Sequence, residues 1–176
     1  MNIFILNTGR CGSTTFIKAC KHINNYTSTH ESLIKLTGKK RLAYPLNHIE
    51  ADNRLSWFLG RLDQKYANNA FYVHLSRNRQ QTTESFCKRE HSGIIKSYKE
   101  GVLLGGEQQG IEEIVEDYIE TVETNIALFL KDKTNKMIFN LENASDDFEI
   151  FWHKISARGD RQRAIKEWRT IYNASD

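Results

Sequence analysis

Residues 3–17 read IFILNTGRCGSTTFI, and the rest of the chain can be placed relative to this stretch. Ile3 to Leu6 form a short apolar run, which predicts a strand covered on both faces. Hydroxyl residues follow Gly12, and apolar residues then recur at helical spacing, which predicts a helix. The stretch therefore predicts a buried strand, a turn that contains two glycines, and a helix.

The turn in this stretch has the composition of an anion site. A helix N-terminus presents free backbone N–H groups and a partial positive charge, and glycine lets a ligand approach the backbone. The turn also carries Arg10 and several hydroxyl groups. An ordinary turn with a capping serine is the alternative. A triphosphate-binding loop of the type GxxxxGK[ST] is excluded, because only two residues separate Gly9 from Gly12 and Ser13 stands where the lysine would be.

Two motifs occur in order along the chain. The first is the run from Gly9 to Thr14, with arginine two residues before a Gly-Ser-Thr triplet, and the second is a strand that ends in Arg77, with Ser85 eight residues later. Together they resemble the signatures of sulfotransferases that use 3′-phosphoadenosine 5′-phosphosulfate (PAPS). The first resembles the 5′-phosphosulfate loop and the second the 3′-phosphate site. The resemblance implies PAPS-binding residues, which are Gly9, Arg10, Cys11, Gly12, Ser13, Thr14, Thr15, Arg77 and Ser85.

Fold class follows from the length, the composition and this resemblance. A chain of 176 residues, of which 39% are hydrophobic, is long enough to bury its own core, so we expect a single domain over 1–176. The pattern predicts an α/β fold with a short parallel sheet flanked by helices. The resemblance implies the P-loop NTPase-like sulfotransferase architecture, with transfer of a sulfuryl group from PAPS to an acceptor hydroxyl or amine and release of the desulfated product PAP.

Other elements are predicted from periodicity and turn residues. Strands are expected at 26–30, 70–76 and 136–141, and helices within 48–66, 80–89, 111–130 and 148–155. In the first of these helical stretches, three polar residues precede the apolar stripe and could reach an acceptor: His48, Glu50 and Asp52. The glycine-rich stretch 90–110 is expected to be irregular, either a lid over the acceptor or a surface insertion.

Residues after the predicted strand 26–30 are candidates for the catalytic base. In a parallel sheet they lie on the same edge as the anion loop. Several sulfotransferases place an acidic residue or a histidine here, so the resemblance implies Glu31 as the first choice and His30 as the second, with Arg10 stabilising developing charge. Alternatively, Glu31 begins a helix and His30 ends the strand. The basic run 39–41 is a solvated loop or holds an anionic acceptor.

Near the carboxyl end, Arg158 and Gly159 resemble the Arg-x-Gly loop with which cytosolic sulfotransferases bind the 3′-phosphate and adenine. The two residues are adjacent here, and Trp168 stands nine residues further on, so the spacing departs from that motif. The resemblance would nevertheless add Arg158 and Gly159 to the nucleotide site. A basic amphipathic helix is the alternative.

Several classes of chemistry are not expected. The histidines lack the spacing of metal ligands, and His30-Glu31 is not a zinc motif because Ile34 stands where the second histidine would be. Cys11 lies where a helix N-terminus would favour a thiolate, but the CxxxxxR loop of a phosphatase is broken by Ile17. We therefore expect no metal and no cysteine nucleophile.

Composition also bounds location and partners. Three cysteines predict free thiols, and the amino terminus resembles neither a signal peptide nor a membrane span, so we expect a cytoplasmic protein. A net charge of +3 suits an anionic ligand without requiring nucleic acid. The expected acceptor is a small molecule or a carbohydrate, and the oligomeric state is open. The alternatives are a P-loop-like nucleotide phosphotransferase and a non-catalytic nucleotide or nucleic-acid binder.

Overall fold

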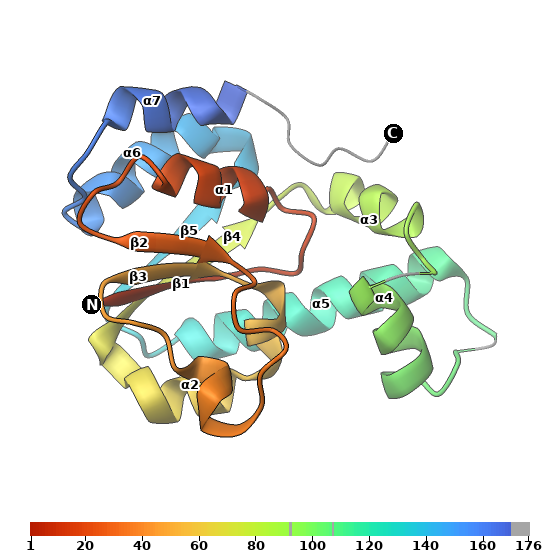
Figure 1. Ribbon diagram of the computed structural model, residues 1–176. Helices are drawn as coiled ribbons and strands as arrows, with labels where there is room; N and C mark the ends of the chain where they lie inside the picture. The colour runs from red at the N-terminus through yellow and green to blue at the C-terminus, as the bar shows by residue number, and fades with distance from the viewer. Residues whose placement is uncertain (92, 107, 170–176) are drawn as a thin grey trace.

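The computed structural model describes residues 1–91, 93–106 and 108–169 (Figure 1). These residues form a sheet of five parallel strands in the order β2-β3-β1-β4-β5. The predicted α/β fold, with a short parallel sheet flanked by helices, is confirmed. The strands are β1 (Asn2–Leu6), β2 (Thr27–His30), β3 (His48–Ala51), β4 (Ala70–Ser76) and β5 (Lys136–Asn140).

Strand β1 is central because it is apolar on both faces. All of its residues are buried, and its side chains alternate between two cores. Ile3 and Ile5 belong to one core, whereas Phe4 and Leu6 belong to the other. The loop that follows β1 therefore lies in the middle of the carboxyl edge of the sheet, between the neighbouring strands β3 and β4.

Helices cover both faces of the sheet (Figure 1). On one face lie α1 (Ser13–Cys20), α6 (Ala144–Lys154) and α7 (Arg161–Lys166), and on the other lie α2 (Leu59–Tyr66) and α5 (Ile111–Leu130). Beyond the carboxyl edge lie α3 (Arg79–Cys87) and α4 (Gly93–Ser97). Short helical turns complete the described chain: η1 (Gly38–Leu42), η2 (Asn53–Trp57), η3 (Ala67–Asn69), the π-helical η4 (Tyr98–Val102), η5 (Leu141–Asn143) and η6 (Glu167–Arg169).

The predicted strands at 26–30, 70–76 and 136–141 are confirmed to within a residue at their ends, and so is the long helix at 111–130. Two helices are displaced at their ends: 80–89 becomes Arg79–Cys87, and 148–155 becomes Ala144–Lys154. The prediction for 48–66 was wrong over its first residues, because His48–Ala51 is strand β3. Periodicity missed β3 because two of its buried residues, His48 and Glu50, are polar.

The stretch 90–110 is more ordered than its glycines suggest. It contains α4 and η4, and it contributes Ile95 and Tyr98 to the core beside α5. The Tyr98 hydroxyl donates a hydrogen bond of 2.5 Å to Asp117. The expectation of an irregular stretch was therefore wrong for these residues.

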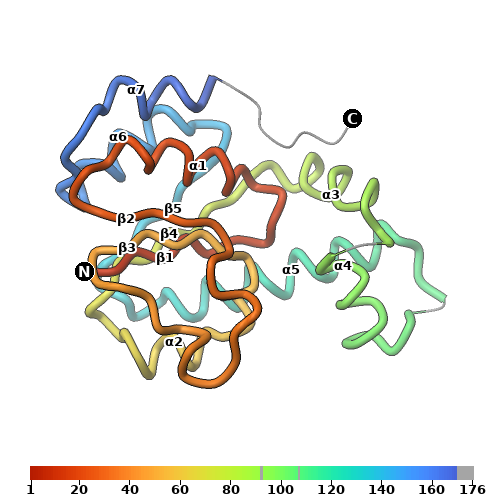
Figure 2. The backbone as a smooth tube through the Cα atoms, viewed as in Figure 1, coloured from red at the N-terminus to blue at the C-terminus, as the bar shows by residue number. Residues whose placement is uncertain are grey.

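Segments far apart in the sequence meet on the α1 face. Figure 2 shows α7, near the carboxyl end, running beside α1. The basic run at the carboxyl end thus forms a helix over 161–166, and its last residues, 170–176, lie outside the described part of the chain. Among the helices that the structure describes, none has the length and apolar character needed to cross a bilayer.

Candidate anion-binding site

The loop after β1 has a left-handed backbone at three of its residues. The φ angles are 96° at Gly9, 60° at Arg10 and 83° at Gly12. For a residue with a side chain this conformation costs roughly 1–2 kcal/mol, so Arg10 is strained. The loop is held by Asn7, whose side chain accepts a hydrogen bond of 2.8 Å from the Gly9 N–H and donates one to the carbonyl of Ile5.

The next residue, Thr8, anchors the loop to the α5 side of the sheet. Its carbonyl accepts hydrogen bonds from the Tyr118 hydroxyl at 2.6 Å and from the Asn53 amide at 3.3 Å. A Cβ atom at Gly9 would lie 3.1 Å from that same amide nitrogen. The loop is thus packed closely on one side, and it has little room for a side chain at Gly9.

Gly12 joins the loop to α1. A Cβ atom there would lie 2.7 Å from the Cδ1 end of the Leu141 side chain, which would have to shift, and the left-handed backbone is the stronger reason for glycine. Gly12 is also the N-cap, and in this described segment no side chain caps the helix. The alternative of a turn with a capping serine is therefore wrong. Of the predicted loop residues after it, Ser13 and Thr14 are half-buried and Thr15 is buried.

The two sequence motifs meet at this loop. The Arg10 Nε donates a hydrogen bond of 2.8 Å to the hydroxyl of Ser85, which lies 75 residues away on α3. Arg77, at the end of β4, donates from Nη1 to the Arg10 carbonyl at 3.3 Å. Arg77 is also held by the side-chain carbonyl of Gln81, one turn into α3, at 3.0 Å. The fold therefore brings Gly12, Arg77 and Ser85 to one place.

Positive charges are crowded at this place. Burial lowers the pKa of Arg10, and the positive charges of Arg89 and Arg77 lower it further. The repulsion between like charges is reduced when an anion binds between them. Sequence reasoning missed Arg89, although its position gives a signal. It follows Ser85 by four residues and lies in the turn after α3, close enough for its charge to act on Arg10.

The Cys11 side chain is buried in the protein. Its thiol donates to the Gly9 carbonyl at 3.1 Å and lies 3.2 Å from the Thr8 hydroxyl. Burial raises the pKa of Cys11 to about 11, because the charged thiolate would lose its hydration. The expectation that the helix N-terminus favours a thiolate here was therefore wrong.

The candidates for the base lie at the end of β2, on the same edge. The His30 Nε2 lies 2.9 Å from the hydroxyl of Ser13, the first residue of α1. The Glu31 carboxylate forms an ion pair of 3.0 Å with Arg54, which sequence reasoning did not identify. Glu31 lies in a turn with φ of 53°, so the alternative in which it begins a helix is wrong.

The polar residues of β3 are buried, and so are Asp52 directly after it and Arg41 at the end of the basic run, whereas Lys39 and Lys40 are exposed. Asp52 is 0% exposed and forms an ion pair with Arg41, which is 2% exposed. Burial alone would lower the pKa of Arg41, but the charge of Asp52 raises it above its ordinary value. The interpretation of Arg41 as part of a solvated loop or an acceptor site was therefore wrong. His48 and Glu50 are bonded to each other instead of facing an open crevice.

The structure does not bring Arg158 and Gly159 to the loop. Gly159 pairs with Ile23 in an antiparallel bridge, and the Arg158 carbonyl accepts a hydrogen bond from Asn24. These partners follow the carboxyl end of α1, about 12 Å along the helix from its N-terminus. A Cβ atom at Gly159 would lie 2.0 Å from the His22 carbonyl oxygen, which explains the glycine without a ligand.

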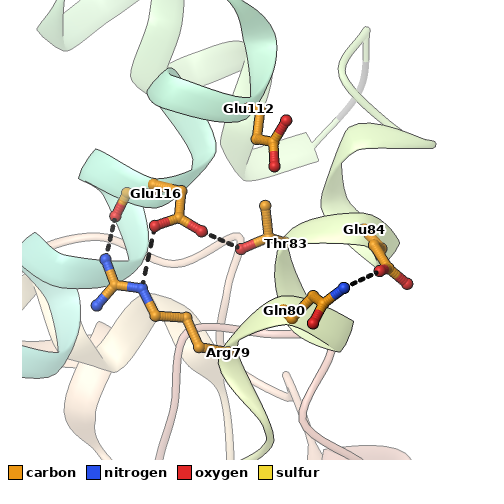
Figure 3. A pocket seen from close by; sticks show the side chains of 6 residues that line it. All are labelled: Arg79, Gln80, Thr83, Glu84, Glu112 and Glu116. Atoms are coloured by element: carbon orange, nitrogen blue, oxygen red, sulfur yellow. Dashed lines mark hydrogen bonds and ion pairs between the residues drawn. The ribbon is translucent and has the colours of Figure 1, made fainter.

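Two hollows of similar size lie elsewhere. One, of about 320 Å³, is lined by residues of α3 and α5, among which Arg79 and Thr83 both bond to Glu116 (Figure 3). The other, of about 360 Å³, lies between the segment 56–60 and α5. The linings of both hollows leave out Arg10, Arg77 and Ser85. The candidate anion site is thus distinct from these hollows.

The sequence was compared with models of protein families and with curated proteins, and neither comparison found a match.

Proposed function

We propose that this protein is a PAPS-dependent sulfotransferase that acts on a small-molecule or carbohydrate acceptor. The observation that carries the proposal is the contact of Arg10 with Ser85 and of Arg77 with the Arg10 carbonyl. Two motifs that separately resemble the two ends of a PAPS site thereby share one cluster of positive charge. A doubly phosphorylated nucleotide would offset the repulsion within that cluster.

The roles of the residues follow from their positions. The N–H groups at the start of α1 and the Arg10 guanidinium hold the 5′-phosphosulfate and stabilise the negative charge that develops on the leaving group. Arg77 and Ser85 hold the 3′-phosphate. Arg89 adds the further positive charge that the resemblance would have assigned to Arg158. Arginine and amide groups thus provide the positive charge that the reaction needs.

His30 accepts the proton of the acceptor hydroxyl in this proposal. Its ring contacts Ser13 at the start of α1, whereas the Glu31 carboxylate is paired with Arg54. Glu31 and Arg54 then line the acceptor side of the site. A positioned general base contributes roughly 10²–10⁴-fold to a rate, and this sets the expected loss when it is removed.

Ligand binding tests the nucleotide site first. PAP should raise the thermal midpoint of the protein, whereas ATP with magnesium should have a much smaller effect. Arg10→Ala should abolish the PAP effect. Stabilisation by ATP with magnesium alone would favour a nucleotide phosphotransferase, and steeply salt-dependent binding of an oligonucleotide would favour a nucleic-acid binder.

Transfer of labelled sulfate from PAPS across a library of sugars, small alcohols and amines tests the reaction. His30→Gln should lower turnover by about 10²-fold or more while PAP affinity is kept. Glu31→Gln is the matched variant on the neighbouring residue, and it should act on the acceptor KM more than on kcat. A loss of kcat only in Glu31→Gln would transfer the role of base to Glu31.

A further inference from the structure

Glu50 is a buried carboxylate with no role in the contacts proposed above. It is 0% exposed and lies on β3, opposite Thr29 of β2. Its two oxygens accept hydrogen bonds from the Ser32 N–H at 2.7 Å, the Ser32 hydroxyl at 2.7 Å and the Thr29 hydroxyl at 2.6 Å. A carboxylate without water is costly to bury, so only a specific set of donors makes it stable at this position.

His48 completes this set of donors. Its Nε2 lies 3.1 Å from Glu50 Oε2, and its Nδ1 lies 2.7 Å from the Thr27 hydroxyl. The Thr29 hydroxyl donates its proton to Glu50, and its oxygen lies 2.9 Å from His48 Nε2, so the network assigns the ring proton to Nε2, where Thr29 and Glu50 share it. Oε1 of Glu50 accepts from the Ser32 N–H, whereas Oε2 has three donors within hydrogen-bonding distance: the Thr29 hydroxyl, the Ser32 hydroxyl and the His48 Nε2–H.

This network keeps Glu50 charged. Burial works to raise the pKa of Glu50, but the hydrogen bonds from His48, Thr29 and Ser32 together hold it below its ordinary value. The carboxylate is therefore ionised at neutral pH, and its bonds to the turn are charge-assisted and correspondingly strong.

The donors from Thr29 and Ser32 flank the two candidate bases. Between them, Glu31 has the left-handed φ of 53°, and its N–H donates to the Ala51 carbonyl at 3.0 Å. Glu50 thus binds the chain on both sides of the dipeptide His30-Glu31. The backbone between these two attachment points has little freedom, and the side chains of the dipeptide project toward Ser13 and Arg54.

We propose that Glu50 is a positioning residue that holds the His30 ring against Ser13 by fixing the turn from Thr29 to Ser32. The inference rests on the proposed function, in which His30 accepts the proton. Two acceptor oxygens are required, because both oxygens bind Ser32. Glutamine has the same shape but offers one oxygen, and its NH₂ group would face a donor.

The decisive variant is Glu50→Gln, with two variants for comparison. Ser32→Ala removes one hydroxyl donor but keeps the backbone N–H, so it should have a smaller effect of the same kind. Tyr72→Phe removes a hydrogen bond of 2.9 Å to the Ala67 carbonyl, before the start of β4. It loses a hydroxyl of a buried residue far from the turn, and so measures the effect of lowered stability alone.

Two measurements on the full chain separate positioning from stability. By NMR, Glu50→Gln should weaken the contact between the His30 ring and Ser13 and should speed amide hydrogen exchange at Ser32. With PAPS and an acceptor found in the library, kcat should fall about 10²-fold, because a base displaced by about 1 Å loses roughly that factor. PAP affinity should stay within about twofold of the wild type, since that site is made by other residues.

The outcomes distinguish this inference from the proposed function. If the wild type neither binds PAP nor transfers sulfate, the proposed function fails, and the NMR measurement still decides whether Glu50 positions His30. An unchanged contact between His30 and Ser13 in Glu50→Gln would overturn the inference, as would an equal loss of kcat in Tyr72→Phe. A displaced His30 ring with unchanged kcat would support the positioning role of Glu50 and overturn the assignment of His30 as the base in the proposed function.

Discussion

Two halves of the carboxyl edge of the sheet handle charge in opposite ways. The arginine half, around β1 and β4, consists of Arg10, Arg77 and Arg89. Burial lowers the pKa of Arg10, and the positive charges of Arg89 and Arg77 lower it further. The carboxylate half consists of Glu50 on β3 and Asp52 directly after it. Its buried charges are matched by Arg41 and by hydrogen-bond donors of the turn that follows β2.

The difference separates the proposed binding site from internal structure. In the carboxylate half, the partners of each charge come from the chain itself, and the folded protein therefore depends on them. In the arginine half, positive charges repel one another. A bound anion would be attracted by all of them and would reduce this repulsion, which favours its binding. The comparison predicts that substitutions in one half lower stability and that substitutions in the other half lower ligand affinity.

Asp52→Ala should have the largest effect. It leaves the Arg41 charge buried without its carboxylate, and removal of one partner of a buried pair costs about 3–5 kcal/mol. Urea unfolding measures the loss. The double variant Arg41→Met with Asp52→Leu removes both charges and should recover most of the stability. A loss in Asp52→Ala of only a few tenths of a kcal/mol would end the distinction between the two halves.

Arg77→Ala should reduce PAP affinity about 100-fold, or roughly 2.7 kcal/mol, and should leave urea unfolding within about 0.5 kcal/mol of the wild type. Arg79→Ala is the matched control, because Arg79 lies two residues away and forms ion pairs with Glu116 and Glu120. Isothermal titration with PAP measures both affinities. Equal affinity losses in the two variants would show that Arg77 has no special position.

Ser85→Ala should weaken PAP binding by about tenfold, the value of one hydrogen bond of roughly 1.4 kcal/mol. Thr83→Val is its partner for comparison on the same helix, since the Thr83 hydroxyl donates to Glu116 on α5. It should leave PAP affinity unchanged. If Thr83→Val weakened binding as much as Ser85→Ala, the helix as a whole would matter more than the hydroxyl beside Arg10.

The smallest effect is the pH dependence that Glu50 contributes. Its pKa in the folded state lies below the ordinary value of 4.5, so it adds stability above about pH 4.5 that is lost as the pH falls through the folded-state pKa. Urea midpoints measured across this acidic range should fall less steeply in Glu50→Gln than in the wild type. Parallel curves for the two proteins would contradict the role of the network around Glu50.

The sequence predicted the helices and strands whose buried residues are apolar. Strands β1 and β4 are continuous apolar runs, and α5 carries a regular stripe, so their types follow from the pattern alone. Strand β3 was missed because His48 and Glu50 look like surface residues. Their burial is stable only through partners on β2 and in the turn after it, and no local pattern contains that information.

The structure brings the residues of the two motifs together, but it does not add Arg158 and Gly159 to them. Sequence resemblance pointed to Arg158 and Gly159, which the structure places beside Ile23 and Asn24 instead. It left out Arg89, which lies in the turn after α3 and whose charge acts on Arg10. Two adjacent residues in a loop do not define where their side chains lie in the fold. A strand that ends where a helix begins does restrict the positions of the side chains at that junction.

The sequence by itself determined the α/β class, the glycine loop after a buried central strand, and the residues of the two motifs. Only the tertiary structure decided that these motifs meet at the Arg10–Ser85 contact, that Arg41 is a buried ion-pair partner, and that Glu50 binds the turn at His30. The physical reason is range. Apolar periodicity and backbone conformation act over a few residues, whereas hydrogen bonds and charges act between side chains that the fold brings together from distant positions.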